Sequence, residues 1–138
     1  MTFEVAVLLS VGRHPASGRA RRAELDSRAL ELALRLAAAS AGDGAPVRVH
    51  AVHAGSPAEP ALRDYLGMGV ERLTVLDIPA SADPLAPLIA HLAARRPSLV
   101  LAGMRAGSTL VVAQRGDAGS SQRFREQSSA AICSREKR

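Results

Sequence analysis

The chain has 138 residues, enough for one domain with a single core but too few for two. Its apolar content is 47%, much of it alanine, and its aromatic residues are Phe3, Tyr65 and Phe124, so we expect a core of modest area per residue. No apolar stretch reaches the ~20 residues of a membrane-spanning helix, and no secretory leader pattern opens the chain, so we expect a cytoplasmic protein without membrane insertion.

The formal net charge of +5 is unevenly distributed along the chain. Residues 1–102 carry 11 basic and 10 acidic side chains, whereas residues 103–138 carry 7 basic and 3 acidic ones. A basic tail without interleaved aromatic residues is typical of a solvated segment, so we expect no nucleic-acid partner. The single cysteine, Cys133, excludes an internal disulfide, and without a base spaced beside it an incidental thiol is favoured over a catalytic one.

The first third of the chain predicts a strand, a loop and a helix. Residues 3–10, FEVAVLLS, are apolar on both faces, which is typical of a buried parallel strand. Residues 12–24 contain a proline, two glycines and several arginines, and we expect a loop there. Residues 25–39 place apolar side chains three or four apart, which predicts a helix. The residues of its apolar face are Leu25, Ala29, Leu32 and Leu36.

The pattern then repeats with short connections. Residues 46–52 predict a strand, residues 57–69 a short helix, and residues 71–78 a third strand. Residues 84–96 predict a helix that begins at an Asp-Pro pair, and residues 98–102 a fourth strand. The side chains expected to share one face of that last helix are Leu85, Leu88, His91 and Leu92.

This alternation predicts an α/β fold, a doubly wound and mainly parallel Rossmann-like sheet with helices on both faces. In such sheets ligands bind beyond the carboxyl ends of the strands, where the strand order reverses. With the order 3-2-1-4, the reversal lies between the first and fourth strands. Residues 10–12 would then lie beside residues 103–107, and we expect a ligand at that edge.

Beyond Gly107 the patterning is lost. Residues 110–113 form one apolar run that is too short to assign to a helix or a strand, and residues 120–138 are rich in serine and arginine. We therefore expect one domain at residues 1–107 and a divergent, disordered tail at residues 108–138.

No catalytic constellation is apparent, and we expect a protein that is not an enzyme. There is no Walker motif and no GxGxxG after the first strand. His50 and His53 are three apart on one strand, which directs them to opposite faces and argues against a shared metal. His91 is interpreted as a packed or half-buried histidine rather than a base.

Two features permit an anion or nucleotide site. Gly103 and Gly107 offer unobstructed main-chain N–H groups that can bind an anion, and Arg105 between them either adds a charge or points to water. Asp26 is interpreted first as the N-cap of its helix, and alternatively as a partner of a ribose hydroxyl.

Three segments resemble a known family. ALRDYLGMGVERLTVLD (61–77) resembles the "ALAMGADRAVLV" motif of the electron transfer flavoprotein beta subunit family. DPLAPLIAHLAARRPSLVLAGMRA (83–106) is similar to its "DPLATARALAAAIRKLGPDLVLCGRQA", and LDSRALELALRL (25–36) to its "FDEYALEEALRL". The three segments occur in the family's order, and the resemblance as a whole extends over roughly residues 3 to 106.

The resemblance implies a Rossmann-like domain of the adenine nucleotide alpha hydrolase-like kind that pairs with an alpha subunit carrying FAD. It implies AMP as a structural nucleotide, and a heterodimer that carries electrons from flavin dehydrogenases to an acceptor. By position, the residues implied to line the AMP pocket and begin its phosphate loop are Leu8, Leu25, Asp26, Ala54, Gly103, Arg105, Ala106 and Gly107.

The sequence departs from the family at two places. The family's "NPFD" before the first helix is here Ala23-Glu24-Leu25-Asp26, and the acidic, glycine-containing loop expected after "GxxA" is replaced by GSTLVVAQRGDAGSS. The switch to serine- and arginine-rich sequence is typical of an out-of-frame end in a GC-rich gene. We therefore expect a truncated or frameshifted beta subunit.

Two other functions stay open from the sequence. One is a stand-alone adenine-nucleotide binder of the universal stress protein type, whose Gly-Ser pattern is faintly matched by Gly107-Ser108 and Gly119-Ser120. The other is a non-functional remnant, whose fourth strand would lie near an unprotected sheet edge.

Overall fold

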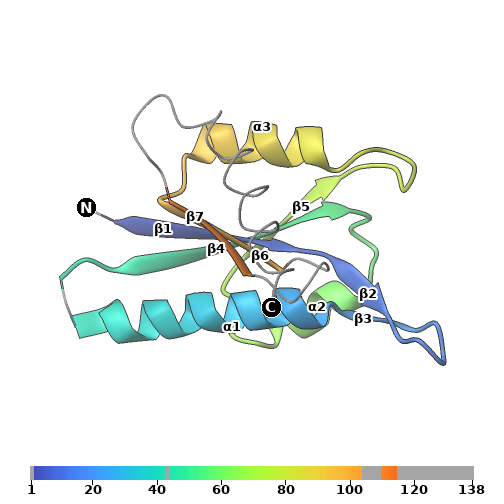
Figure 1. The fold of residues 1–138 in the computed structure, drawn as a ribbon, viewed down its shortest axis with the longest axis horizontal. Coiled ribbons are helices and arrows are strands. Elements are labelled where there is room, and N and C mark those ends of the chain that lie inside the picture. The colour runs from blue at the N-terminus through green and yellow to red at the C-terminus, as the bar shows by residue number, and fades with distance from the viewer. Residues whose placement is uncertain (1, 43, 104–109, 115–138) are drawn as a thin grey trace, which may run out of the picture.

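The computed structural model describes residues 2–42, 44–103 and 110–114 of the protein (Figure 1). Its main feature is a five-stranded sheet in the order β5-β4-β1-β6-β7, and a separate two-stranded sheet joins β2 to β3. The strands are β1 (Phe3–Leu9), β2 (Val11–Arg13), β3 (Ala20–Arg22), β4 (Val47–Gly55), β5 (Leu73–Asp77), β6 (Leu99–Gly103) and β7 (Leu110–Gln114). The helices are α1 (Glu24–Ala39), a 3-10 turn η1 (Ser40–Gly42), α2 (Ala61–Leu66) and α3 (Leu85–Arg95).

The predicted α/β fold is confirmed. β1 lies at the centre of the sheet and pairs in parallel with β4 from Phe3↔Val47 to Leu9↔His53, and with β6 from Val5↔Leu99 to Leu8↔Ala102. β5 extends the parallel sheet beyond β4. The four predicted strands thus occur in the predicted order 3-2-1-4, with the strand order reversing between β1 and β6.

The helices form one layer on each face of the sheet. α1 and α2 lie on one face and α3 on the other (Figure 1). The chain order explains this distribution, because α1 and α2 connect strands that progress in one direction and α3 connects β5 back across to β6. With crossovers of a constant hand, reversing the direction of travel moves the helix to the opposite face.

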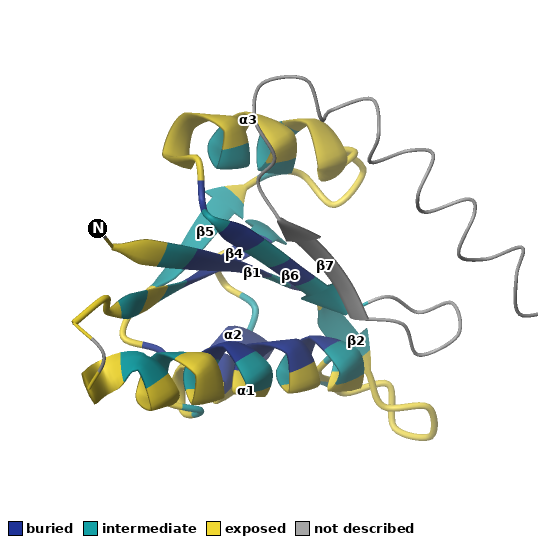
Figure 2. Cartoon of the chain, turned by 60° about the vertical axis from the view of Figure 1, so that its left-hand side comes forward, coloured by how far each residue is buried: buried dark blue, intermediate teal, exposed yellow. Residues whose placement is uncertain are grey.

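The core lies mainly between the sheet and the α1–α2 layer. Figure 2 shows buried positions where α1 and α2 meet the sheet, and Ala29, Leu30 and Ala33 of α1 are all inaccessible to solvent. The sequence of α1 is rich in alanine, leucine, glutamate and arginine, which are strong helix formers. From α2, Leu62 and the ring of Tyr65 complete this cluster.

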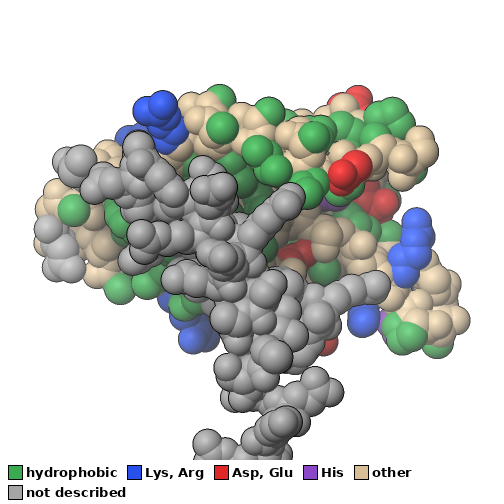
Figure 3. Space-filling view, turned by 45° about the horizontal axis from the view of Figure 1, so that its top comes forward, with side chains coloured by type: hydrophobic (Ala, Val, Ile, Leu, Met, Phe, Trp, Pro, Cys, Tyr) green, Lys and Arg blue, Asp and Glu red, His purple; other side chains and the backbone are tan. Residues whose placement is uncertain are grey.

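The α3 layer is much more open. No residue of α3 is buried, and Leu85 and Ile89 expose 59% and 57% of their surface. Hydrophobic side chains are accordingly visible on the α3 side of the molecule (Figure 3). Of the four residues predicted to share the apolar face of this helix, Leu88, His91 and Leu92 are half-buried, whereas the prediction is wrong for Leu85.

Two segments differ from the sequence-based prediction. The region predicted as a loop at residues 12–24 contains the β2–β3 hairpin, in which Val11 pairs with Arg22 and Arg13 with Ala20. Its turn places Gly18 at φ +68°, a conformation that favours glycine. The short helix predicted at 57–69 is restricted to Ala61–Leu66. Pro57 and Pro60 occupy the turn before it, where their fixed φ is tolerated.

The apolar run after Gly107 forms β7, to which the sequence assigned no type. β7 pairs antiparallel with β6 from Leu99↔Gln114 to Gly103↔Leu110, so β6 has a partner on each side and the fourth predicted strand is not the sheet edge. The rest of the predicted tail at 108–138 lies outside the described residues, apart from this strand.

Candidate functional site

The carboxyl ends of β1 and β6 are joined by the side chain of Asp26. Its Oδ2 accepts hydrogen bonds from the main-chain N–H of Ser10, at 2.7 Å, and from the Ser10 hydroxyl. Its Oδ1 accepts a hydrogen bond of 3.0 Å from the main-chain N–H of Gly103. Asp26 is only 4% exposed, so one buried carboxylate holds together the two strand ends at which the strand order reverses.

This arrangement corrects the interpretation of Asp26 as an N-cap. The helix begins at Glu24, its N-cap is Ala23, and no side chain caps its first turn. Asp26 therefore lies within the first turn and points across to the sheet. Hydrogen bonds to a charged acceptor are worth more than neutral ones, about 1.5–3 kcal/mol each, so the contact stabilises the edge substantially.

Gly103 is required at its position by the close approach of α1. A Cβ atom added there would lie 2.5 Å from Oδ1 of Asp26, 2.6 Å from the Asp26 nitrogen and 2.6 Å from the carbonyl carbon of Leu25. Two of these neighbours are main-chain atoms of a helix, which cannot move aside individually. The glycine thus permits contact between helix and strand. The prediction that its N–H is unobstructed and open to an anion is wrong, because that N–H donates to Asp26.

Tyr65 supplies a second link at this edge. Its hydroxyl accepts a hydrogen bond of 2.8 Å from the N–H of Ala23 and donates one of 2.7 Å to the carbonyl of Ser10. The residue is fully inaccessible, and burial raises the pKa of its hydroxyl to about 12. Sequence reasoning did not single out Tyr65, because nothing in its local pattern distinguishes it from a core aromatic residue.

β4 contributes a further contact at the same edge. The side chain of His53 is buried, and its Nδ1 lies 2.9 Å from the carbonyl oxygen of Leu9. Because a carbonyl can only accept, Nδ1 carries the proton in this hydrogen bond. Ala54, one residue further along β4, is half-buried.

The structure brings together some of the predicted site residues. Asp26 and Gly103 are in direct contact, and Leu25 lies against Gly103 through its main chain. Leu8 and Ala54 lie near the ends of adjacent strands, β1 and β4. Leu8 alternates with Leu9 along β1 and is half-buried. The remaining predicted residues, Arg105, Ala106 and Gly107, lie outside the described residues.

The β2–β3 hairpin adds positive charge beside this edge. It leaves the end of β1 and leads directly into α1, and its arginines are exposed. They are Arg13, Arg19, Arg21 and Arg22. A basic hairpin next to main-chain N–H groups raises the local concentration of anionic ligands.

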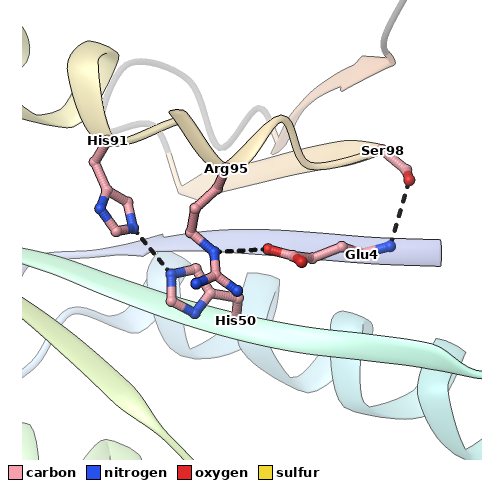
Figure 4. Close-up of polar contacts among 5 residues, drawn as sticks. All are labelled: Glu4, His50, His91, Arg95 and Ser98. Atoms are coloured by element: carbon pink, nitrogen blue, oxygen red, sulfur yellow. Dashed lines mark hydrogen bonds and ion pairs between the residues drawn. The ribbon is translucent and has the colours of Figure 1, made fainter. Parts of the chain in front are cut away.

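A second polar cluster lies between α3 and the sheet, away from the carboxyl ends of β1 and β6 (Figure 4). Nε2 of His50 on β4 lies 3.0 Å from Nε2 of His91 on α3, and Arg95 of the same helix pairs with Glu4 at 2.9 Å. The main-chain N–H of Glu4 also donates to the hydroxyl of Ser98. Through these contacts α3 is attached to β1 and β4.

The pKa of His50 is lowered in this cluster. Burial is the main cause, and the positive charges of Arg95, His91 and Arg72 act in the same direction, while Glu4 opposes them. The prediction that His91 is half-buried is confirmed. Within residues 2–42, 44–103 and 110–114, three or more potential metal ligands nowhere gather into one group.

An apolar groove lies elsewhere, between β5 and the segment that contains α2. No residue of the carboxyl edge described above contributes to it, so the two features are separate. Its lining residues are Pro57, Ala58, Glu59, Pro60, Leu62, Arg63, Leu66, Leu73 and Val75. Among the described helices, none has the length and apolar character needed to cross a membrane.

Comparison with known proteins supports the resemblance seen in the sequence. A family model for the electron transfer flavoprotein domain matches residues 16–116. The protein named electron transfer flavoprotein subunit beta, from Chromohalobacter salexigens, is 47% identical over 105 residues. That alignment covers 75% of this chain and 37% of the relative, so the chain spans little more than a third of the relative's length.

Proposed function

Because the chain belongs to the electron transfer flavoprotein family, we propose that it acts as a beta-type subunit of such a protein. In this role it is a non-catalytic partner of an FAD-carrying alpha subunit, and the heterodimer shuttles electrons from flavin dehydrogenases to an acceptor in the cytoplasm. FAD supplies the redox chemistry when bound, mainly to the alpha subunit. This chain's own residues hold AMP and shape the surroundings of the flavin.

The observation that carries the AMP site is the Asp26 link between β1 and β6. It lies where the strand order of the parallel sheet reverses, and ligands of such sheets bind beyond the carboxyl ends at that point. The surroundings suit an anionic ligand because the exposed arginines of the hairpin lie beside this edge.

The residues proposed to contact AMP follow from this geometry and the family motif. Both carboxylate oxygens of Asp26 are already hydrogen-bonded within the protein, so its contribution is to hold the loop ends. The lining is proposed to come from Leu8, Leu25, Ala54 and Gly103, with Arg105, Ala106 and Gly107 continuing the phosphate loop.

Co-expression with the cognate alpha subunit tests the subunit assignment. A stable, yellow complex with one bound FAD is expected, and its purification should yield AMP after denaturation. A colourless complex, or failure of the two chains to associate, would contradict the proposed function. Co-expression of the alpha subunit without this chain serves as the reference for flavin that binds independently.

Titration calorimetry with AMP tests the nucleotide site directly. Asp26→Asn replaces one of the two acceptor oxygens by an NH2 donor, so the side chain can no longer accept from both strand ends, and AMP binding is expected to weaken by about tenfold or more. Glu31→Gln changes an exposed carboxylate on the same helix and should leave the affinity unchanged. Equal affinity in both variants and the wild type would argue against a site at this edge.

A further inference from the structure

We propose that Tyr65 is a positioning residue for the nucleotide site, which it serves by fixing the start of α1 to the end of β1. It acts through its hydroxyl and without touching the nucleotide. The inference deepens the proposed function and rests on it, because it assigns to the site a residue that is not among those implied by the family resemblance to line the AMP pocket.

The Tyr65 hydroxyl forms hydrogen bonds with two main-chain groups that lie just outside β1 and α1. Ser10 follows the last residue of β1, and Ala23 precedes the first residue of α1. The Ala23 N–H donates to the hydroxyl and the hydroxyl donates to the Ser10 carbonyl. Ser10 is exposed and Ala23 half-buried, so these hydrogen bonds serve to join the two segments through one fixed oxygen rather than to satisfy buried groups.

Ser10 takes part in the hydrogen bonds of both Tyr65 and Asp26 at the carboxyl ends of the strands. Its carbonyl accepts from Tyr65, and its N–H and hydroxyl donate to Asp26, which in turn accepts from Gly103. Ser10 therefore connects the Tyr65 contact to the Asp26 contact, and Asp26 extends the connection to Gly103. Loss of the Tyr65 hydroxyl releases the Ser10 carbonyl, and because the same residue donates to Asp26, we expect the effect to reach the strand end at Gly103.

Packing in the core fixes the position of Tyr65. Its ring is fully inaccessible in the core cluster, and it comes from α2, a helix of six residues. A tyrosine whose ring is fixed by packing presents its hydroxyl at a defined point. Desolvation raises its pKa to about 12, so the hydroxyl remains a donor throughout the neutral range.

The residue that precedes α1 has no polar side chain of its own. Ala23 stands where the quoted "NPFD" motif has asparagine, so the sequence supplies no polar side chain at that position. The N-cap of α1 accordingly has no side-chain hydrogen bond. The Tyr65 hydroxyl reaches this position from another helix and accepts from the main-chain N–H of Ala23, so it fixes the residue before α1 where no side chain caps the helix.

The test compares Tyr65→Phe with a matched variant, Ser98→Ala, which also deletes one partly buried hydroxyl but at the amino end of the sheet. Tyr65→Phe is expected to weaken AMP binding by about tenfold, whereas Ser98→Ala leaves it unchanged. Urea unfolding of both variants measures how much stability each hydroxyl contributes. Unchanged AMP affinity in a folded Tyr65→Phe protein would overturn the proposal.

Amide hydrogen exchange separates this inference from the proposed function. Tyr65→Phe should accelerate exchange of the Gly103 amide, a change that a purely local role of Tyr65 would not produce. If the wild type does not bind AMP, the proposed function fails. Unchanged exchange at Gly103 would instead refute the positioning role, whatever the wild type binds.

The wild type offers a measurement that needs no variant. Tyr65 is the sole tyrosine and the chain has no tryptophan, so intrinsic emission reports on this ring. AMP should change the emission along a saturable curve with the calorimetric affinity. Constant emission at saturating AMP would contradict the proposal even if Tyr65→Phe failed to fold.

Discussion

The two faces of the sheet are built differently. On one face, α1 buries Ala29, Leu30 and Ala33 completely and Asp26 almost completely. On the other, α3 buries no residue and is attached by half-buried leucines and the polar cluster of His50, His91, Arg95 and Glu4. The strand ends of the candidate site are fixed by α1 and α2, so the well-packed face is also the one that holds the proposed nucleotide site.

Stability is therefore unevenly distributed between the two faces of the sheet. Apolar burial contributes about 25 cal/mol per Å², and the α1–α2 face holds most of the inaccessible apolar side chains. Elements with few buried contacts open locally at lower free energy than the core. We therefore expect α3 to be the element that responds most readily to mutation of polar contacts and to pH.

The largest effect is expected at Leu30. Leu30→Ala creates a cavity in the α1 face and should lower the free energy of unfolding by about 2–5 kcal/mol. Ile89→Ala removes a comparable side chain from α3, where it is 57% exposed, and should cost within about 0.5 kcal/mol. Urea denaturation of the two variants measures the contrast, and similar losses would show that the faces are equivalent.

A smaller effect is expected at Gly103. Gly103→Ala forces a Cβ against the main chain of α1 and should cost about 1–3 kcal/mol, with weaker AMP binding. Gly67→Ala is its control, because a Cβ there would lie 3.4 Å from its nearest neighbour at a φ of −62°. A Gly103→Ala protein as stable as the wild type would mean that α1 can move away from β6.

The α3 face should respond to pH. Burial and neighbouring positive charges lower the pKa of His50 in the folded state, so between that value and about 6.5 the unfolded chain binds more protons. Stability is therefore greatest above the unfolded pKa and falls as the pH decreases through about 6.5. Unfolding followed from about pH 7.5 to about pH 5 measures this loss, which His50→Gln should reduce. An unchanged pH dependence in that variant would assign the effect to other groups.

The smallest effect is expected at the Glu4–Arg95 ion pair. Its side chains are 25% and 44% exposed, and partly exposed pairs contribute about 0–1 kcal/mol. Glu4→Gln should cost about 0.5 kcal/mol, and less at high salt, since screening already weakens the pair. A loss as large as that of Leu30→Ala would show that polar contacts, rather than packing, hold the α3 face.

Most of the sheet could be predicted from the sequence, since buried parallel strands leave continuous apolar runs. The β2–β3 hairpin could not, because its strands, VGR and ARR, are three residues long and too short to show a period. Leu85 was placed on the buried face because periodicity gives the face of a helix but not the extent of its contact. Asp26 was read as a cap because a local pattern cannot show that a side chain reaches residues 16 and 77 positions away.

The site was accessible to sequence reasoning in outline only. The predicted strand order and the glycine at the end of the fourth strand indicated the sheet edge where a ligand is expected, and the family motifs indicated Asp26. The links through Ser10 and Tyr65 depend on contacts between residues 55 positions apart, for which the sequence carries no local signal.

The central position of β1 has a consequence for how the chain folds. β1 is synthesised before the strands on either side of it, and its neighbour β6 begins only at Leu99, so the middle of the sheet cannot close until β6 has been made. Such distant pairings impose a large loop-closure entropy and make folding slow compared with helical proteins. Until β6 is synthesised, one edge of the apolar strand β1 stays unpaired and exposed to aggregation. We therefore expect the yield of folded protein to depend on chaperones and on the rate of translation.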